Sequence, residues 1–147
     1  MTMPSGKYYI GDLCYALSAD WVEIHDLTIK GRGINAVVLD GEFNLHDGRR
    51  FALFNTTYGD GCYSDQFGRS YGVDAGSIGA VLLKDARLGA EFEIAGTEVY
   101  SRPHNVLCAH IIDFPEPFEC RSISGVIQLG HITIPTADDE ADVEEAA

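Results

Sequence analysis

The sequence predicts an all-β domain: a mainly antiparallel sandwich or barrel of about nine or ten short strands, with one short helix near residues 19–29. Three observations predict this class. Short apolar or alternating runs recur from Ile34 onward at about the 8–12-residue spacing typical of sandwiches and barrels. Gly, Asp-Gly and Pro separate these runs as turn signals. Only one stretch has the spacing of an amphipathic helix.

The predicted helix follows an N-terminal strand at residues 7–10, which Gly11-Asp12 interrupts. Ser18 is a candidate N-cap, because its hydroxyl can accept a bond from the first free N–H groups. After it, the side chains of Trp21, Ile24, His25 and Thr28 share one helix face at i, i+3, i+4 and i+7. The helix is expected to end at Gly31.

The letters of Gly31-x-Gly33-x-x-Ala36 match a dinucleotide-binding fingerprint. That fingerprint requires a strand before it and a helix after it. Here a helix precedes and a strand over residues 34–39 follows, so we reject the match.

The rest of the chain is predicted to consist of strands and turns. Asp40-Gly41 and Asp47-Gly48 are two-residue hairpin signals between alternating stretches. In the strand over residues 50–57, Phe51, Leu53 and Asn55 are expected on one face, and Ala52 and Phe54 on the other. The remaining predicted elements are a hairpin over 63–71 turning at 65–68, strands 77–83, 91–94, 97–101 and 106–112, and a last hairpin over 118–134 turning at 124–125.

Length and charge predict the domain organisation. At 147 residues the chain suits one domain. Its net charge of −13 is uneven, because residues 136–147 contain six acidic side chains and no basic one. We therefore predict a single β domain over residues 1–135 and an acidic, disordered C-terminal tail over 136–147. This acidity argues against direct nucleic-acid binding, which needs basic surface against phosphates.

Cysteine usage and hydropathy bear on cofactors and compartment. The four cysteines show no C-x-x-C spacing, so we predict neither a metal site nor a cofactor. No apolar stretch approaches the roughly 18 residues needed to span a membrane, and the N-terminus lacks a signal-peptide pattern. We expect a cytoplasmic protein with free thiols, no membrane partner, and either a small molecule or another protein as its partner.

The candidate site is the stretch from Thr56 to Gly79, which holds six glycines, three aspartates and three tyrosines in 24 residues. Aspartates between glycines can close turns, bind a ligand or perform acid–base chemistry, and all three roles stay open. Aromatic side chains between glycines can line a pocket for a planar or sugar-like ligand, or serve as half-buried scaffold. The predicted ligand contacts are Asp12, Tyr58, Asp60, Tyr63, Asp65, Tyr71 and Asp74.

Signals for catalysis are weak. Asp60 and Asp74 are the candidate catalytic residues, provided that the fold brings their carboxylates together. The spacing of the aspartates matches no calcium-binding loop, and Ser77 lacks the G-x-S-x-G setting of a hydrolase nucleophile. No histidine is paired with a cysteine in the sequence, so we favour a protein that is not an enzyme.

Several motifs together carry a resemblance to a family. They are GD-x-CY at 11–15, YGDG-x-Y at 58–63, VDAG-x-IG at 73–79 and the closing GVI-x-x-G-x-I-x-I at 125–134. The chain resembles, over residues 7–136, a family of small bacterial and phage β-proteins. Members of that family often have proline where this chain has Leu13. The resemblance implies a phage or bacterial accessory protein but no particular activity.

Three functions are consistent with the sequence. The preferred one is a non-catalytic binding domain with a small-molecule or peptide site in residues 56–79. The second is an acidic inhibitor or decoy that acts on another protein and so weakens with salt. The third is an Asp-dependent hydrolase, with or without a metal, that uses Asp60 and Asp74. The oligomeric state is left open, because exposed sheet edges also favour self-association.

Overall fold

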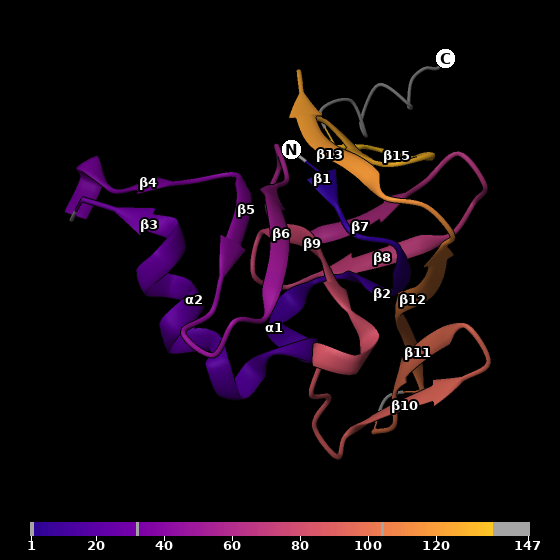
Figure 1. The fold of residues 1–147 in the computed structure, drawn as a ribbon. Coiled ribbons are helices and arrows are strands. Elements are labelled where there is room, and N and C mark those ends of the chain that lie inside the picture. The colour runs from indigo at the N-terminus through magenta and orange to yellow at the C-terminus, as the bar shows by residue number, and fades with distance from the viewer. Residues whose placement is uncertain (1, 32, 104, 137–147) are drawn as a thin grey trace.

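The computed structural model describes residues 2–31, 33–103 and 105–136, and it shows an all-β fold (Figure 1). The described part contains fifteen strands, more than expected, partly because three of them are only two residues long. These are β1 (Thr2–Met3), β3 (Ile29–Lys30) and β4 (Val37–Val38). All pairings are antiparallel, as predicted.

The central layer is a seven-stranded sheet in the order β10-β11-β12-β2-β9-β6-β5. Its strands are β2 (Gly6–Gly11), β5 (Gly41–Asn44), β6 (Arg50–Asn55), β9 (Ser77–Leu82), β10 (Phe92–Ala95), β11 (Glu98–Ser101) and β12 (Val106–Phe114). Both faces of its central strands are buried, which explains why β9 reads as an almost continuous apolar run rather than as an alternation.

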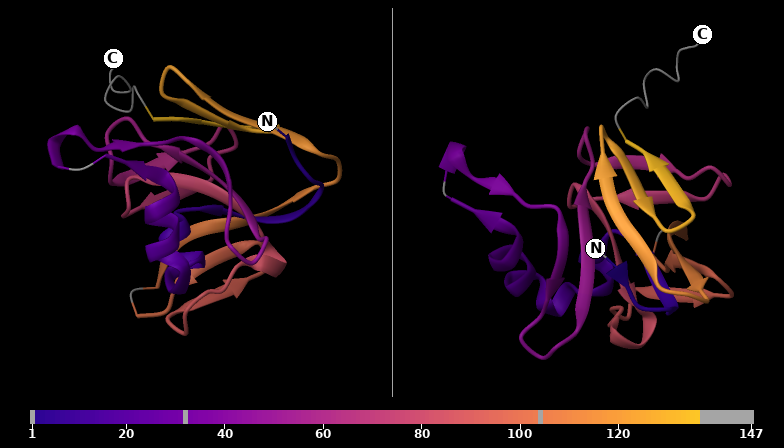
Figure 2. Two further views of the ribbon diagram at one scale, coloured as in Figure 1. Left: turned by 60° about the vertical axis from the view of Figure 1, so that its left-hand side comes forward. Right: turned by 45° about the horizontal axis from the view of Figure 1, so that its top comes forward.

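A second layer covers one face of this sheet, so the fold is a sandwich (Figure 2). It consists of a four-stranded sheet, in the order β1-β13-β14-β15, and a separate hairpin of β7 and β8. The bounds are β7 (Gly61–Ser64), β8 (Ser70–Val73), β13 (Phe118–Ile123), β14 (Val126–Leu129) and β15 (Ile132–Pro135). The core between the layers includes Tyr8, Phe54 and Ile78 from the large sheet and Tyr71 and Ile127 from the covering layer.

Helices cover the opposite face of the large sheet. They are α1 (Leu13–Ala16) and α2 (Trp21–Thr28), with the one-turn 3-10 helices η1 (Ser18–Asp20) and η3 (Leu83–Asp85). A third 3-10 turn, η2 (Gly33–Asn35), lies between β3 and β4, and its Ile34 is fully exposed. Leu13, Leu17 and Ile24 pack there with Tyr9 and Phe51, which belong to a second core cluster. The two clusters confirm the predicted faces of β6, with Phe51 and Leu53 on the helix side and Ala52 and Phe54 on the other.

The predicted helix is present, but its predicted cap is wrong. Ser18 starts the 3-10 turn, and Asp20 occupies the N-cap of α2 without a side-chain capping bond. The Asp20 carboxylate instead accepts two hydrogen bonds, of 2.9 and 3.0 Å, from the buried guanidinium of Arg49. That pairing joins the start of α2 to the β5–β6 turn.

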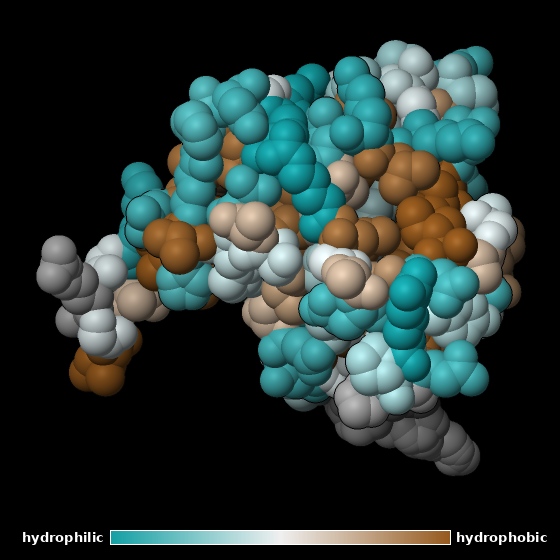
Figure 3. All heavy atoms as spheres, turned by 90° about the horizontal axis from the view of Figure 1, so that it is seen from below, coloured by the Kyte–Doolittle hydropathy of each residue, from teal (hydrophilic) through white to brown (hydrophobic). Residues whose placement is uncertain are grey.

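One of the two Asp-Gly hairpin predictions is also wrong. Asp47-Gly48 does turn β5 into β6, but β4 pairs with β3 and not with β5. The Asp40 carboxylate accepts hydrogen bonds from the backbone N–H and the side-chain amide of Asn55, so it closes a contact between strands rather than a hairpin. Strands β3 and β4 form an arm that projects from the body, and apolar atoms gather near its end (Figures 1 and 3).

Thr136, the first residue of the predicted tail, packs against the body of the protein. Thr136 is fully buried, and its backbone N–H and its hydroxyl both donate to the carbonyl of Gly125 at 2.7 Å. That carbonyl belongs to the predicted Ser124-Gly125 turn, where both residues have positive φ, as a tight β13–β14 hairpin requires. Residues 137–147 of the predicted tail lie outside the described residues.

Asp65 organises the β7–β8 hairpin. Its buried carboxylate accepts hydrogen bonds from the Tyr71 hydroxyl (2.7 Å), from Nε of Arg69 (2.7 Å), and from the backbone N–H groups of Phe67 and Arg69. Burial alone would raise the pKa of Asp65, but these hydrogen bonds outweigh it and hold the pKa below its ordinary value. Tyr71 in turn meets the ring of His110 edge-on, which joins the hairpin to β12.

We predict that Asp65→Asn lowers the free energy of unfolding at pH 7 by about 2–3 kcal/mol, because the variant loses the negative charge of the group that accepts all four hydrogen bonds. The midpoint of thermal unfolding should fall by roughly 5–10 °C. A carboxyl group with a lowered pKa stabilises the folded state above its ordinary pKa of 3.8 and loses that contribution as the pH falls through the folded-state value. Urea unfolding of both proteins from pH 7 to pH 3 should therefore show their difference shrinking at the acid end. A constant difference would contradict this role.

Gly79 allows α1 to lie against β9. A Cβ on this residue would come within 2.6 Å of Leu13 Cδ1 and closer still to the carbonyl oxygen of Ala52. We expect Gly79→Ala to destabilise the protein by about 2–3 kcal/mol, since a backbone carbonyl cannot move aside. Gly72→Ala is the matched control, because a Cβ there meets nothing within 4 Å. Equal melting temperatures for the two variants would refute the close approach.

Candidate functional site

The turn between β8 and β9 is held by Asp12. This fully buried residue is the N-cap of α1, and its Oδ1 accepts the backbone N–H of Cys14 at 2.9 Å. Its Oδ2 accepts the backbone N–H groups of Asp74 and Ala75, each at 2.7 Å. One carboxylate thus joins the first helix to the end of the glycine-rich stretch, and its polar atoms face the protein interior.

The predicted ligand contacts separate into two groups. Asp12, Tyr63, Asp65 and Tyr71 are buried, and their polar atoms are committed to internal hydrogen bonds; the Tyr63 hydroxyl, for example, donates to the carbonyl of Gly59 at 2.9 Å. These four side chains therefore stabilise the fold through internal hydrogen bonds, and their role as ligand contacts stays a prediction. Tyr58, Asp60 and Asp74 are exposed, and of these Asp74 borders the hollows described below.

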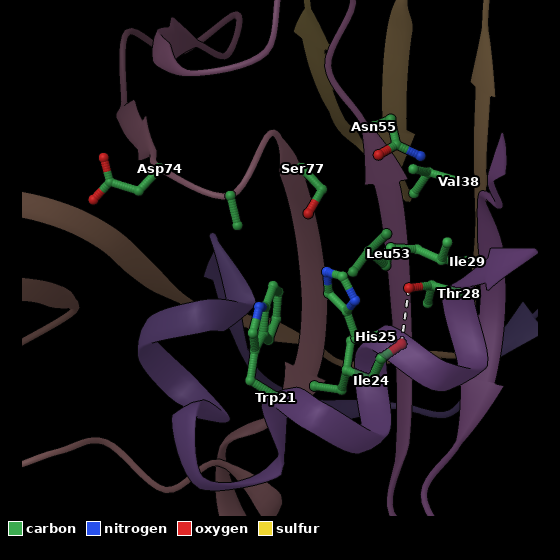
Figure 4. Close-up of a pocket in the computed structure, with 11 residues that line it drawn as sticks. Trp21, Ile24, His25, Thr28, Ile29, Val38, Leu53, Asn55, Asp74 and Ser77 are labelled. Atoms are coloured by element: carbon green, nitrogen blue, oxygen red, sulfur yellow. Dashed lines mark hydrogen bonds between the residues drawn. The ribbon is translucent and has the colours of Figure 1, made fainter. Parts of the chain in front are cut away.

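The first hollow has a volume of about 430 Å³ and lies between α2, the base of the arm and the ends of β6 and β9 (Figure 4). Ile24, Ile29, Val38 and Leu53 form its apolar lining. Trp21 and His25 enter it from α2, one helical turn apart, because residues i and i+4 share a face. We call this space the Trp21 hollow.

The polar groups of the Trp21 hollow come from three elements. Ser77 of β9 is only 3% exposed, and no hydrogen-bond partner for its hydroxyl is found among residues 2–31, 33–103 and 105–136. The side-chain amide of Asn55 donates to Asp40, which leaves its carbonyl oxygen toward the hollow (Figure 4). Since buried polar groups are almost always hydrogen-bonded, the Ser77 hydroxyl is a hydrogen-bonding group that the described residues leave open at this hollow.

Asp74 does not complete a catalytic triad with these groups. Figure 4 shows its carboxylate directed away from His25 and Ser77, and Oδ2 accepts a hydrogen bond from the hydroxyl of Tyr15. A serine nucleophile needs a base and an orienting acid in one hydrogen-bonded chain. This arrangement does not supply that chain.

A second hollow, of about 300 Å³, lies on the side of the turn to which the Asp74 carboxylate points. Its lining consists of Tyr15, Asp74, Phe92, Ser101, Val106 and Cys108. The rings of Tyr15 and Phe92 contact each other with centroids 5.0 Å apart. Burial, together with the hydrogen bond and the charge of Asp74, raises the pKa of Tyr15, so its hydroxyl stays protonated and donates to that carboxylate. We call this space the Tyr15 hollow.

Asp60 lines neither hollow, although it was predicted to act with Asp74. The carboxylates of Asp60 and Asp74 both raise the pKa of the same thiol, that of Cys14. Burial, then Asp12, Asp74 and Asp60, raise the pKa of Cys14, which disfavours the reactive thiolate. In the described part of the chain, no cluster of three or more His, Cys, Asp and Glu side chains could hold a metal ion.

Sequence reasoning placed Trp21 and His25 correctly on one helix face but did not assign them to a site. Asn55 was likewise predicted on the same face of β6 as Leu53, and Asn55 and Leu53 both line the Trp21 hollow. The sequence signal for a site was the presence of polar side chains beside apolar ones on one face of α2 and on one face of β6. This signal alone did not predict the site, because nothing in the sequence indicates that α2 lies beside the end of β6.

The chain was compared with protein-family models, with curated proteins and with solved structures, and it matches none of them. Function is therefore inferred from the geometry of the two hollows. Among the described helices, none is long and apolar enough to cross a membrane.

We predict that Asp12→Asn destabilises the protein by about 2–3 kcal/mol. An amide group can accept at only one of its two ends, so it leaves either the two N–H groups of the turn or that of Cys14 unpaired. Asp60→Asn is the matched control and should change the free energy of unfolding by less than about 0.5 kcal/mol, because this carboxylate is exposed. Chemical denaturation measures both variants. A small effect at Asp12, or a large one at Asp60, would reverse the roles assigned to them.

Proposed function

We propose that this protein is a non-catalytic binding domain for a small uncharged polar molecule with a flat face, such as a sugar or a nucleoside-like ring, held in the Trp21 hollow. The observation that carries the proposal is the Ser77 hydroxyl, which is buried, lacks a protein partner among the described residues and borders the hollow beside Trp21. A bound hydroxyl or amide would supply the missing hydrogen bond.

Size and shape support this class of ligand. A volume of about 430 Å³ falls within the range of small-molecule sites, about 300–1,000 Å³. The indole of Trp21 offers a flat apolar face for stacking, and its N–H can donate to the edge of a ligand. The carbonyl oxygen of Asn55, the hydroxyl of Ser77 and the ring of His25 provide hydrogen-bonding atoms around the same space.

Charge supports an uncharged ligand. Among the residues that the structure describes, no Lys or Arg lines the Trp21 hollow, so a phosphate or carboxylate would find no counter-charge from them there. The chain also carries a net charge of −13, which repels anions at long range. The one carboxylate at the border, Asp74, is turned away from the hollow and is hydrogen-bonded to Tyr15.

Binding is favoured over hydrolysis for two reasons. A two-carboxylate hydrolase needs Asp60 and Asp74 in one hollow, and Asp60 lines neither hollow. A serine hydrolase needs an acid that orients His25, whereas Asp74 points the other way. What the hollow offers is a stacking surface and uncharged hydrogen-bonding groups, which hold a ligand without activating it.

Trp21 makes the proposal directly testable, because it is the only tryptophan in the chain. Its emission should shift saturably on titration with members of a panel of neutral monosaccharides and nucleosides. Ser77→Ala should weaken that binding about tenfold, equivalent to about 1.4 kcal/mol. The same change should leave the melting temperature unchanged or higher, since it removes a buried hydroxyl that has no partner in the free protein.

Phe67→Ala is the control, because Phe67 is an exposed aromatic residue in the β7–β8 turn, within the stretch where the sequence places the site. It should leave the titration unchanged. Sugar phosphates and nucleotides should bind more weakly than their uncharged parents. Preferential binding of the phosphorylated compounds, or loss of binding in Phe67→Ala but not in Ser77→Ala, would overturn the proposed site.

A further inference from the structure

We propose that the Tyr15 hollow is a second binding site, and that its ligand is a small quaternary ammonium group such as a trimethylammonium. The observation behind this is one exposed carboxylate, that of Asp74, beside a contacting pair of aromatic rings in a hollow of about 300 Å³. The inference is independent of the proposed function, because it rests on Tyr15 and Phe92 and not on Trp21 and Ser77.

The aromatic pair provides the first part of the site. The rings of Tyr15 and Phe92 lie 5.0 Å apart at an angle of 42°, so their faces are tilted rather than stacked flat on each other. The face of an aromatic ring carries partial negative charge and attracts a cation placed over it. Two rings that line one hollow are the kind of group with which proteins surround alkylated ammonium ligands.

The carboxylate provides the second part. Oδ2 of Asp74 accepts the Tyr15 hydroxyl, and no hydrogen bond to Oδ1 occurs within the described residues. The backbone N–H of Asp74 is bonded to Asp12, so the turn that presents the carboxylate is fixed. The carboxylate therefore gives the hollow a positioned negative charge before any ligand arrives, which lowers the ordering cost of binding.

The other lining residues select against anions and against strongly hydrated cations. Val106 is apolar, and burial, with a smaller contribution from Asp74, raises the pKa of Cys108, so its thiol stays uncharged. Within residues 2–31, 33–103 and 105–136, no Lys, Arg or His lines the hollow. Apart from Asp74, the hydroxyls among the lining side chains are those of Ser101 and Tyr15, and the Tyr15 hydroxyl is already bonded to Asp74. A primary ammonium with three N–H donors would therefore exchange its water shell for few free acceptors. A quaternary ammonium needs no hydrogen bonds and fits this lining better.

The probe pair for the test is choline and its uncharged isostere 3,3-dimethylbutan-1-ol, titrated into the full-length protein. Isothermal calorimetry measures the affinity, and NMR shifts of the Tyr15 and Phe92 ring protons locate the site. Choline should bind at least tenfold more tightly than the isostere. Raising the ionic strength should weaken choline binding and leave the isostere unchanged, because only the charged probe is screened.

Asp74→Asn should weaken choline binding at least fivefold, and Tyr15→Leu should weaken it by a similar factor. Asp113→Asn is the matched control, because it removes the same charge from an exposed position on β12. It should lower the affinity for choline only slightly, as a small increase in ionic strength would. Tyr15→Phe keeps the ring but loses the bond to Asp74, so it should bind choline better than Tyr15→Leu does.

Several results would overturn the proposal. Equal binding of choline and its isostere would mean that the hollow is merely apolar, and equal losses in Asp74→Asn and Asp113→Asn would mean that only net charge matters. The absence of saturable binding up to about 0.1 M choline would also refute it. Ser77→Ala should leave choline binding intact, so a failure at this site and a failure of the Trp21 hollow can be told apart.

Discussion

The buried carboxylate of Asp12 is the contact on which both hollows depend. A charge without solvent is costly unless donors surround it, and three backbone N–H groups from two segments do so here. They belong to the first turn of α1 and to the turn before β9, which are 62 residues apart for the Asp12–Asp74 contact. Fixing that turn places Ala75 and Ser77 at the Trp21 hollow and the Asp74 carboxylate at the Tyr15 hollow.

Aspartates perform much of this fold's internal hydrogen bonding. Asp12, Asp40 and Asp65 each accept from backbone N–H groups, and Asp20 pairs with the buried Arg49. Asp12 and Asp20 join segments that the β-sheet ladders leave unconnected, whereas Asp40 and Asp65 reinforce strand pairs that the ladders already join. The acidity of the chain is therefore only partly a surface property. Asp74 differs from these residues, since its carboxylate is exposed and faces a hollow.

The two hollows meet at one turn but differ in chemistry. The Trp21 hollow offers a single indole with uncharged hydrogen-bonding groups, whereas the Tyr15 hollow offers two rings and a carboxylate. The difference arises because the Asp74 side chain is directed to one side of the turn and its neighbours Ala75 and Ser77 border the other. A change in the direction of one side chain would give the first hollow a charge and deprive the second of it.

The class of fold, the two faces of β6, the position of α2 and most hairpins could be predicted from the sequence, because they depend on periodicity and turn residues that are local in the chain. Turn closure was one alternative for the aspartates of residues 56–79, Asp60 and Asp74 in particular, whereas Asp12 was predicted as a ligand contact. The packing of the chain instead gives Asp12 an internal role and brings Trp21, Asn55 and Ser77 to one hollow. Asp12 became an internal acceptor because the packing brings it to the backbone N–H groups of Asp74 and Ala75, which are 62 and 63 residues away. No local pattern encodes that packing.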